Sequence, residues 1–163
     1  MFLQYFKKKE NKEQIIAAKQ YKKIISESNM FLNENNFFKE RNYNTSFEIV
    51  SIFLIMFIRR NLLEYNRKLY LKVNDELISL FISDLDESLR AKGIGDISIG
   101  KYVKSYVKKF YFRIKKFPDD NNLYKNESFI EYLKITDLIK NDDYVDVSRK
   151  FNDKFTYFIN YDK

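Results

Sequence analysis

The most informative segment of the chain is residues 81–114, which read FISDLDESLRAKGIGDISIGKYVKSYVKKFYFRI. All three glycines of the chain, Gly93, Gly95 and Gly100, fall within eight of these residues. An acidic segment precedes the glycines and a lysine-rich segment follows them. Because glycine ends helices and permits sharp turns, the segment predicts a helix, a turn and a second helix, with opposite charge on the two arms.

The first arm is a helix predicted over Leu69–Lys92, with one broad apolar face. At about 100° per residue, Asp84 falls inside this face and Asp86 at its edge. A carboxylate among apolar residues needs a partner, because burying an unpaired charge is costly. We therefore expect Asp84 to be partly buried and paired with an arginine, although a contact with a partner protein is an alternative. The candidate arginines are Arg59, Arg60 and Arg113.

The turn and the second helix follow from the glycines. Gly93 is placed to end the first helix in the left-handed conformation, and Gly95 permits the turn. Asp96 or Ser98 can cap the next helix. The glycine spacing differs from the dinucleotide-binding pattern, and no strand precedes it, so a nucleotide site is not expected.

The second arm is an amphipathic helix predicted over Ile99–Phe117 and ended by Pro118. Its apolar stripe includes Val103 and Phe110, and its lysines lie on the opposite side. No acidic residue occurs among residues 97–118 to compensate them. This lysine face is a candidate docking surface, and a plain solvated helix face is the alternative. Its members are Lys101, Lys104, Lys108, Lys109, Lys115 and Lys116.

The rest of the chain also indicates helices. With one proline and three glycines in 163 residues, long stretches run without a helix breaker. We predict an all-α fold, a compact bundle of about six to seven helices in a single domain over residues 11–163, preceded by a basic tail at residues 1–10. That tail is either a frayed terminus or a weak contact with an anionic membrane. The further predicted helices cover residues 11–28, 47–60, 127–140 and 144–161, with an Asn-rich break at 29–36 and a short helical turn at 36–40.

Two of these helices carry specific expectations. In residues 11–28 the apolar face is expected to contain Ile15, Ala18, the stem of Lys22 and Ile25, with Ile16 and Ala17 beside them. Residues 47–60, FEIVSIFLIMFIRR, are too short to span a membrane, which needs roughly 20 apolar residues. They predict a central helix buried on nearly every side, capped by Thr45 or Ser46 and able to continue to Tyr65.

Composition excludes several kinds of chemistry. The chain contains no Cys and no His, so the usual zinc, haem and iron–sulfur ligands are missing. Imidazole acid–base catalysis is excluded as well, and we expect no cofactor. An enzyme that uses Asp84 and Asp86 as acid and base is disfavoured, because the two lie about 160° apart around a helix. The absence of cysteine fits a reducing compartment.

The central segment, residues 81–114, resembles the ubiquinol–cytochrome c chaperones, which are assembly factors for respiratory complex III. The resemblance covers about residues 36–117 and keeps its spacing without a gap over the central segment. Three positions depart from the family pattern: Phe53 stands where the family has His, Phe112 where it has Gly, and Ala91 where it has an acidic residue. The matching residues are Phe37-Phe38, Phe47-Glu48, Arg59-Arg60, Phe81, Asp84-Leu85-Asp86, Leu89-Arg90, Gly93–Asp96, Ser98–Lys101, Phe110-Tyr111 and Arg113.

The resemblance implies an all-α, non-enzymatic chaperone that binds newly made cytochrome b. It implies work at an anionic inner-membrane surface, in the cytoplasm of a bacterium or alternatively on the matrix side of a mitochondrion. A ribosome or a small partner subunit is a further partner left open. The expected partner-binding residues are Lys101, Lys104, Lys108, Lys115, Arg90 and Asp86. The expected structural residues of the motif are Asp84, Gly93, Gly95, Asp96, Phe110, Tyr111, Arg113, Arg59 and Arg60.

A competing hypothesis uses the basic face of Lys101–Lys116 to bind nucleic acid or an anionic membrane. Three observations argue against nucleic acid. The net charge of +7 is moderate, the neighbouring helix is acidic, and the chain has no known recognition motif. We therefore expect no specific nucleic acid partner. Binding to phosphates would weaken steeply with salt, which distinguishes the hypotheses.

Overall fold

The computed structural model describes residues 11–161 and confirms the all-α class. The predicted basic tail, residues 1–10, lies outside the described residues, as do residues 162–163. Among residues 11–161 there is no strand beyond an isolated antiparallel bridge between Phe38 and Ile139. The helices are α1 (Lys12–Glu34), α2 (Tyr43–Leu62), α3 (Arg67–Ala91), α4 (Asp96–Lys116), α5 (Glu127–Thr136) and α6 (Tyr144–Asn160).

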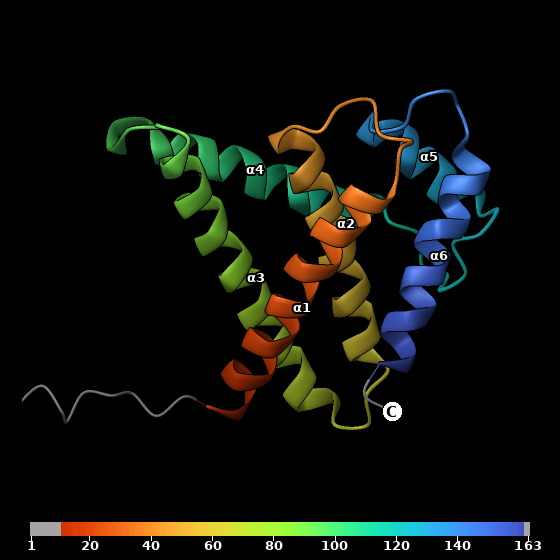
Figure 1. The fold of residues 1–163 in the computed structure, drawn as a ribbon. Coiled ribbons are helices and arrows are strands. Elements are labelled where there is room, and N and C mark those ends of the chain that lie inside the picture. The colour runs from red at the N-terminus through yellow and green to blue at the C-terminus, as the bar shows by residue number, and fades with distance from the viewer. Residues whose placement is uncertain (1–10, 162–163) are drawn as a thin grey trace, which may run out of the picture.

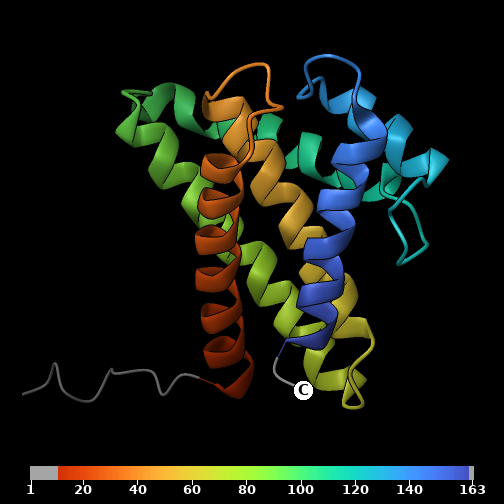
Figure 2. The ribbon, with the colours of Figure 1, turned by 45° about the vertical axis from the view of Figure 1, so that its right-hand side comes forward.

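Helix α2 is the centre of the bundle, as predicted for this segment. Its residues from Ser51 to Phe57 are all buried. Helices α1, α3, α4 and α6 all pack against it, and Figure 1 shows α4 crossing one end of the bundle. In Figure 2, α1 and α6 stand on either side of α2. This enclosure removes the apolar side chains of α2 from water, which is the main source of stability for a helical bundle.

The last helix completes the core on one side of α2. The Phe158 ring lies 5.3 Å from that of Phe53 and 4.7 Å from that of Phe57, measured between ring centroids. Phe151 and Phe155 are also fully buried. Phe53, which departs from the family pattern, therefore serves as a packing residue.

Helix α1 differs from its prediction in length and in face. It continues six residues past Ser28, so the predicted Asn-rich break at 29–36 is mostly helical. The centre of the expected face was wrong, since Ile15 is 55% exposed and Ala18 is exposed, whereas Ala17, expected beside them, is fully buried. The buried positions alternate three and four residues apart, and two of them carry polar side chains, so the stripe does not look apolar in sequence. They are Ala17, Gln20, Ile24, Glu27 and Phe31, with Ser28 beside them.

Capping residues account for other differences in helix bounds. Asn42 caps α2, because its side-chain oxygen accepts a hydrogen bond from the Thr45 backbone N–H at 3.0 Å. The predicted cap at Thr45 or Ser46 was therefore wrong, and α2 ends at Leu62, before Tyr65. Residues 36–40 form the bridge to Ile139 rather than a helical turn. Helix α5 ends at Thr136, because Asp137 takes the left-handed conformation with φ 53°.

Between residues 11 and 161, no helix combines the length and the apolar character needed to cross a bilayer. This includes α2, the most apolar of the six. Its apolar residues face neighbouring helices rather than a continuous outer surface.

Candidate functional site

The turn between α3 and α4 has the geometry that the glycines predicted. Gly93 has φ 89°, and its N–H donates to the Arg90 carbonyl at 2.9 Å. The Ile94 N–H donates to the Leu89 carbonyl at 3.2 Å. This pair of bonds is the Schellman arrangement, in which a left-handed glycine satisfies the last carbonyls of a helix.

The start of α4 differs from the prediction. Gly95 is the N-cap, without a side-chain cap, and Asp96 is the first helical residue. The predicted cap at Asp96 or Ser98 was therefore wrong, since both lie inside α4, but the charge of Asp96 is favourable in the first turn. The Arg90 side chain pairs with both Asp86 and Asp96 and so joins the end of α3 to the start of α4. All three side chains are at the surface, with Arg90 and Asp96 exposed.

The outward side of α4 carries five exposed lysines, which we name the α4 lysine face: Lys101, Lys104, Lys108, Lys115 and Lys116. Within the part of the chain that the structure describes, none of the five forms an ion pair with a carboxylate. Tyr111 and Phe112 are also exposed, at 47% and 45%, and lie between these lysines on the helix. The result is a basic surface with aromatic side chains inside it.

Lys109 was predicted to share this face and does not. Its Nζ lies 2.8 Å from Glu48 Oε1 on α2 and 5.1 Å from the centroid of the Phe47 ring. It lies on the α2 side of α4, at the edge of the helix contact. Lys109 therefore contributes to the packing of α4 on α2 rather than to a docking surface.

The most deeply buried charge of this region is Glu48, which the sequence resemblance matched but to which sequence reasoning gave no role at the site. Its side chain is 1% exposed. Arg113 binds it through two hydrogen bonds, from Nε to Oε2 at 2.9 Å and from Nη2 to Oε1 at 2.7 Å. Burial lowers the pKa of Arg113, but the hydrogen bonds and charge of Glu48 outweigh this and raise the pKa above its ordinary value. Arg113 therefore stays protonated, and its two hydrogen bonds to Glu48 join α2 to α4.

Asp84 is partly buried, as predicted, but the prediction that it pairs with an arginine was wrong. The hydroxyl of Tyr21 on α1 donates to Asp84 Oδ2 at 2.7 Å. Burial, and secondly the hydrogen bond to Asp84, raise the pKa of Tyr21, so the phenol stays protonated as a donor. The three candidate arginines have other partners. Arg113 binds Glu48, Arg59 binds Asp119 at 3.2 Å, and Arg60 binds the Tyr161 carbonyl at 2.8 Å.

The sequence model of the ubiquinol-cytochrome C chaperone family matches residues 37–119, just over half of the chain. The chain belongs to the ubiquinol-cytochrome C chaperone family. No curated protein and no solved structure matches the chain. The match runs from the segment before α2 to the residue after Pro118, close to the 36–117 span of the sequence resemblance. It contains α2, α3, the glycine turn and α4.

Membership in this family gives the chain a ubiquinol-cytochrome c chaperone role and a client protein to bind. The matched residues include the α4 lysine face, the Glu48–Arg113 pair and Asp84. Phe110, a residue of the motif, is fully buried against Phe81, whereas the neighbouring Tyr111 is exposed. Buried motif residues thus hold α2, α3 and α4 together, and exposed ones lie at the α3–α4 turn and on the outer side of α4.

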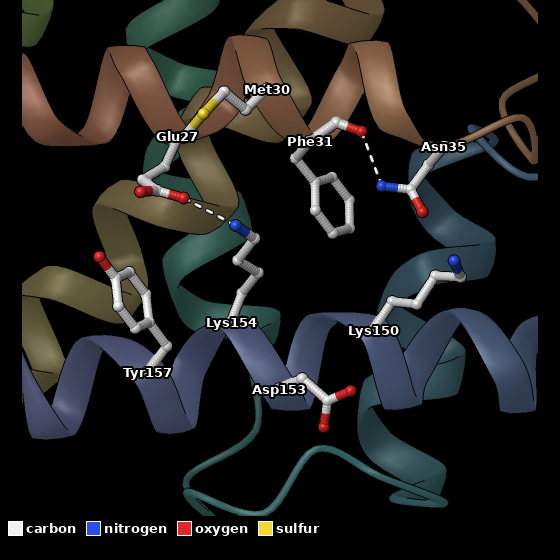
Figure 3. Close-up of a pocket in the computed structure, with 8 residues that line it drawn as sticks. All are labelled: Glu27, Met30, Phe31, Asn35, Lys150, Asp153, Lys154 and Tyr157. Carbon is white, nitrogen blue, oxygen red and sulfur yellow. Dashed lines mark hydrogen bonds and ion pairs between the residues drawn. The ribbon is translucent and has the colours of Figure 1, made fainter.

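A groove lies outside the matched residues, between α1 and α6 (Figure 3). It has a volume of about 500 Å³. Phe31 lines it from α1 and Tyr157 from α6, while Asp153 points away from α1. Lys154 crosses it to reach Glu27 at 2.7 Å. No sequence pattern predicted this groove, because the residues of its two walls are about 120 positions apart in the chain.

Proposed function

We propose that this chain is a non-enzymatic assembly chaperone that binds newly made cytochrome b for ubiquinol–cytochrome c reductase. The observation that carries the proposal is the family match over α2, α3 and α4. The composition is compatible, since these 163 residues contain neither His nor Cys. A chaperone of this kind acts by holding its client, so its work depends on exposed surfaces rather than on a reactive centre.

We further propose that the α4 lysine face sits against the anionic surface of the inner membrane while the client is held. In a bacterium this is the cytoplasmic side, and in a mitochondrion the matrix side. Lysines near an anionic surface contribute about 1 kcal/mol each, and aromatic side chains favour the interface. Five exposed lysines, none of which has a carboxylate partner among residues 11–161, surround Tyr111 and Phe112 and so meet both conditions.

The first test is a deletion strain. We expect its membranes to lose the b-type haem signal in a reduced-minus-oxidised spectrum, together with antimycin-sensitive quinol oxidation. Both should return with the gene. An unchanged spectrum and unchanged oxidation would contradict the chaperone role for cytochrome b.

The second test addresses the membrane surface. The variant Lys104→Glu, Lys108→Glu, Lys115→Glu should lose binding to vesicles that contain phosphatidylglycerol. The matched control, Lys12→Glu, Lys68→Glu, Lys72→Glu, makes the same change in net charge at exposed positions on α1 and α3. Equal losses in both variants would show a general charge effect and refute a specific role for α4.

A further inference from the structure

A small pocket lies between α2 and α3, within the residues that the family match covers. Its volume is about 160 Å³. Its walls are mostly apolar and aromatic, and one carboxylate lies among them. We name it the Asp84 pocket, and its principal lining residues are Tyr43, Phe47, Val50, Phe81, Asp84 and Ser88.

The carboxylate of this pocket lacks a cation. Among residues 11–161, Asp84 has no Lys or Arg nitrogen within 4.0 Å, and the Tyr21 hydroxyl is its hydrogen-bond donor. The other acids inside the bundle are neutralised. Glu48 has Arg113 and Lys109, and Glu27 has Lys23 and Lys154.

This contrast is informative in a chain with a net charge of +7. A partly buried carboxylate among apolar walls is costly without a cation, and one phenol O–H leaves most of its acceptor sites free. In the groove between α1 and α6 the buried carboxylate is that of Glu27, which already contacts two lysines, and the other carboxylate, Asp153, is exposed. Of these two cavities, the Asp84 pocket is therefore the one that contains a partly buried carboxylate without a lysine or arginine partner among residues 11–161.

We propose that the Asp84 pocket receives the side chain of an arginine from the client protein. The guanidinium would pair with the Asp84 carboxylate, and the methylene stem would lie against Phe47 and Val50. Arginine fits better than lysine because its planar cation stacks on aromatic faces. Lysine ammonium groups already lie over two of these rings, with Lys92 Nζ 4.8 Å from the Tyr43 centroid and Lys109 Nζ 5.1 Å from that of Phe47, so an arginine would use ring surface that they leave open.

This inference rests on the proposed client-binding role, but the pocket can be tested without a client. The probes are N-acetyl-L-arginine methylamide and the neutral N-acetyl-L-citrulline methylamide, which has nearly the same shape. Each is titrated into the full chain and followed by two-dimensional ¹H–¹⁵N NMR. We expect the arginine compound to bind at least about fivefold more tightly. Its shifts should centre on the amides of Tyr43, Phe47 and Ser88.

Two variants locate the effect. Asp84→Asn keeps an acceptor for the Tyr21 hydroxyl but removes the charge, so the preference for arginine over citrulline should disappear. Glu87→Gln removes an exposed acid from the same helix and should leave the preference unchanged. The comparison of the two compounds on the unaltered protein stands even if Asp84→Asn fails to fold.

Three outcomes would overturn the inference: equal binding of the two compounds, shifts centred elsewhere, or a preference that persists in Asp84→Asn. None of them bears on the deletion strain. If that strain loses b-type haem while arginine shows no preference, only the pocket proposal fails. If arginine binds as expected while the strain is normal, the proposed function fails instead.

Discussion

Replacing Arg113 with Met removes the two hydrogen bonds that Arg113 donates to the buried Glu48 carboxylate. Removing one partner of a buried ion pair costs about 3–5 kcal/mol, because the remaining charge is left without compensation. Here Lys109 still contacts Glu48 at 2.8 Å, and its side chain reaches the surface with 35% exposure. We therefore expect a loss near the lower end, about 3 kcal/mol.

Thermal unfolding followed by circular dichroism measures this loss. For a chain of this size, 1 kcal/mol shifts the midpoint by about 2–4 °C, so Arg113→Met should lower it by about 6–12 °C. Lys109→Met is the matched control, because it removes the more exposed partner of the same carboxylate. It should cost about 1 kcal/mol or less.

A double variant tests the electrostatic explanation directly. Glu48→Leu combined with Arg113→Met replaces the ion pair by apolar side chains, which is often neutral or stabilising. The double variant should therefore recover much of the stability that Arg113→Met loses. A loss below 1 kcal/mol for Arg113→Met, or a larger loss for Lys109→Met, would refute the assignment of Arg113 as the main partner of Glu48.

Other predictions concern the glycine turn and a buried acid. Gly93→Ala should destabilise the chain by about 1–2 kcal/mol, because φ 89° is strained for any residue with a Cβ. Gly100→Ala, inside α4 with no atom within 4 Å of the new Cβ, should instead stabilise it by about 1 kcal/mol. Glu27→Gln should cost about 2 kcal/mol near pH 7, since it removes the charge that Lys23 and Lys154 contact. Burial raises the pKa of Glu27 but its two lysines lower it more, so the net shift is downward. The stability that this shift contributes is full above the unfolded pKa of about 4.3 and is lost as pH falls through the folded value. The difference in melting temperature between the chain and Glu27→Gln should thus narrow below about pH 4, and a constant difference would contradict the assignment.

The sequence was sufficient for the helices and for the turn at Gly93, because periodicity and glycine act locally. It was insufficient for the face of α1. The buried side chain of Gln20 exchanges two hydrogen bonds with Asn61 of α2, at 2.9 and 2.8 Å. Glu27 contacts Lys154 of α6. A polar residue can occupy a core position only where a distant partner satisfies it, and the identity of that partner is a property of the tertiary structure.

The same reasoning explains why Arg113, one of the three candidate partners of Asp84, pairs with a different acid. The rule that an acid on an apolar face needs a cation applies to both Asp84 and Glu48, and α2 was predicted to be buried on nearly every side. The cost of an unpaired charge rises with burial. The arginine therefore belongs with Glu48, at 1% exposure, rather than with the partly buried Asp84. Asp84 is only partly buried and accepts a hydrogen bond from the Tyr21 phenol, so it needs an internal cation less than Glu48 does. A partly buried Asp84 without an internal cation, in a chain with a net charge of +7, is suited to pair with a cation on another molecule.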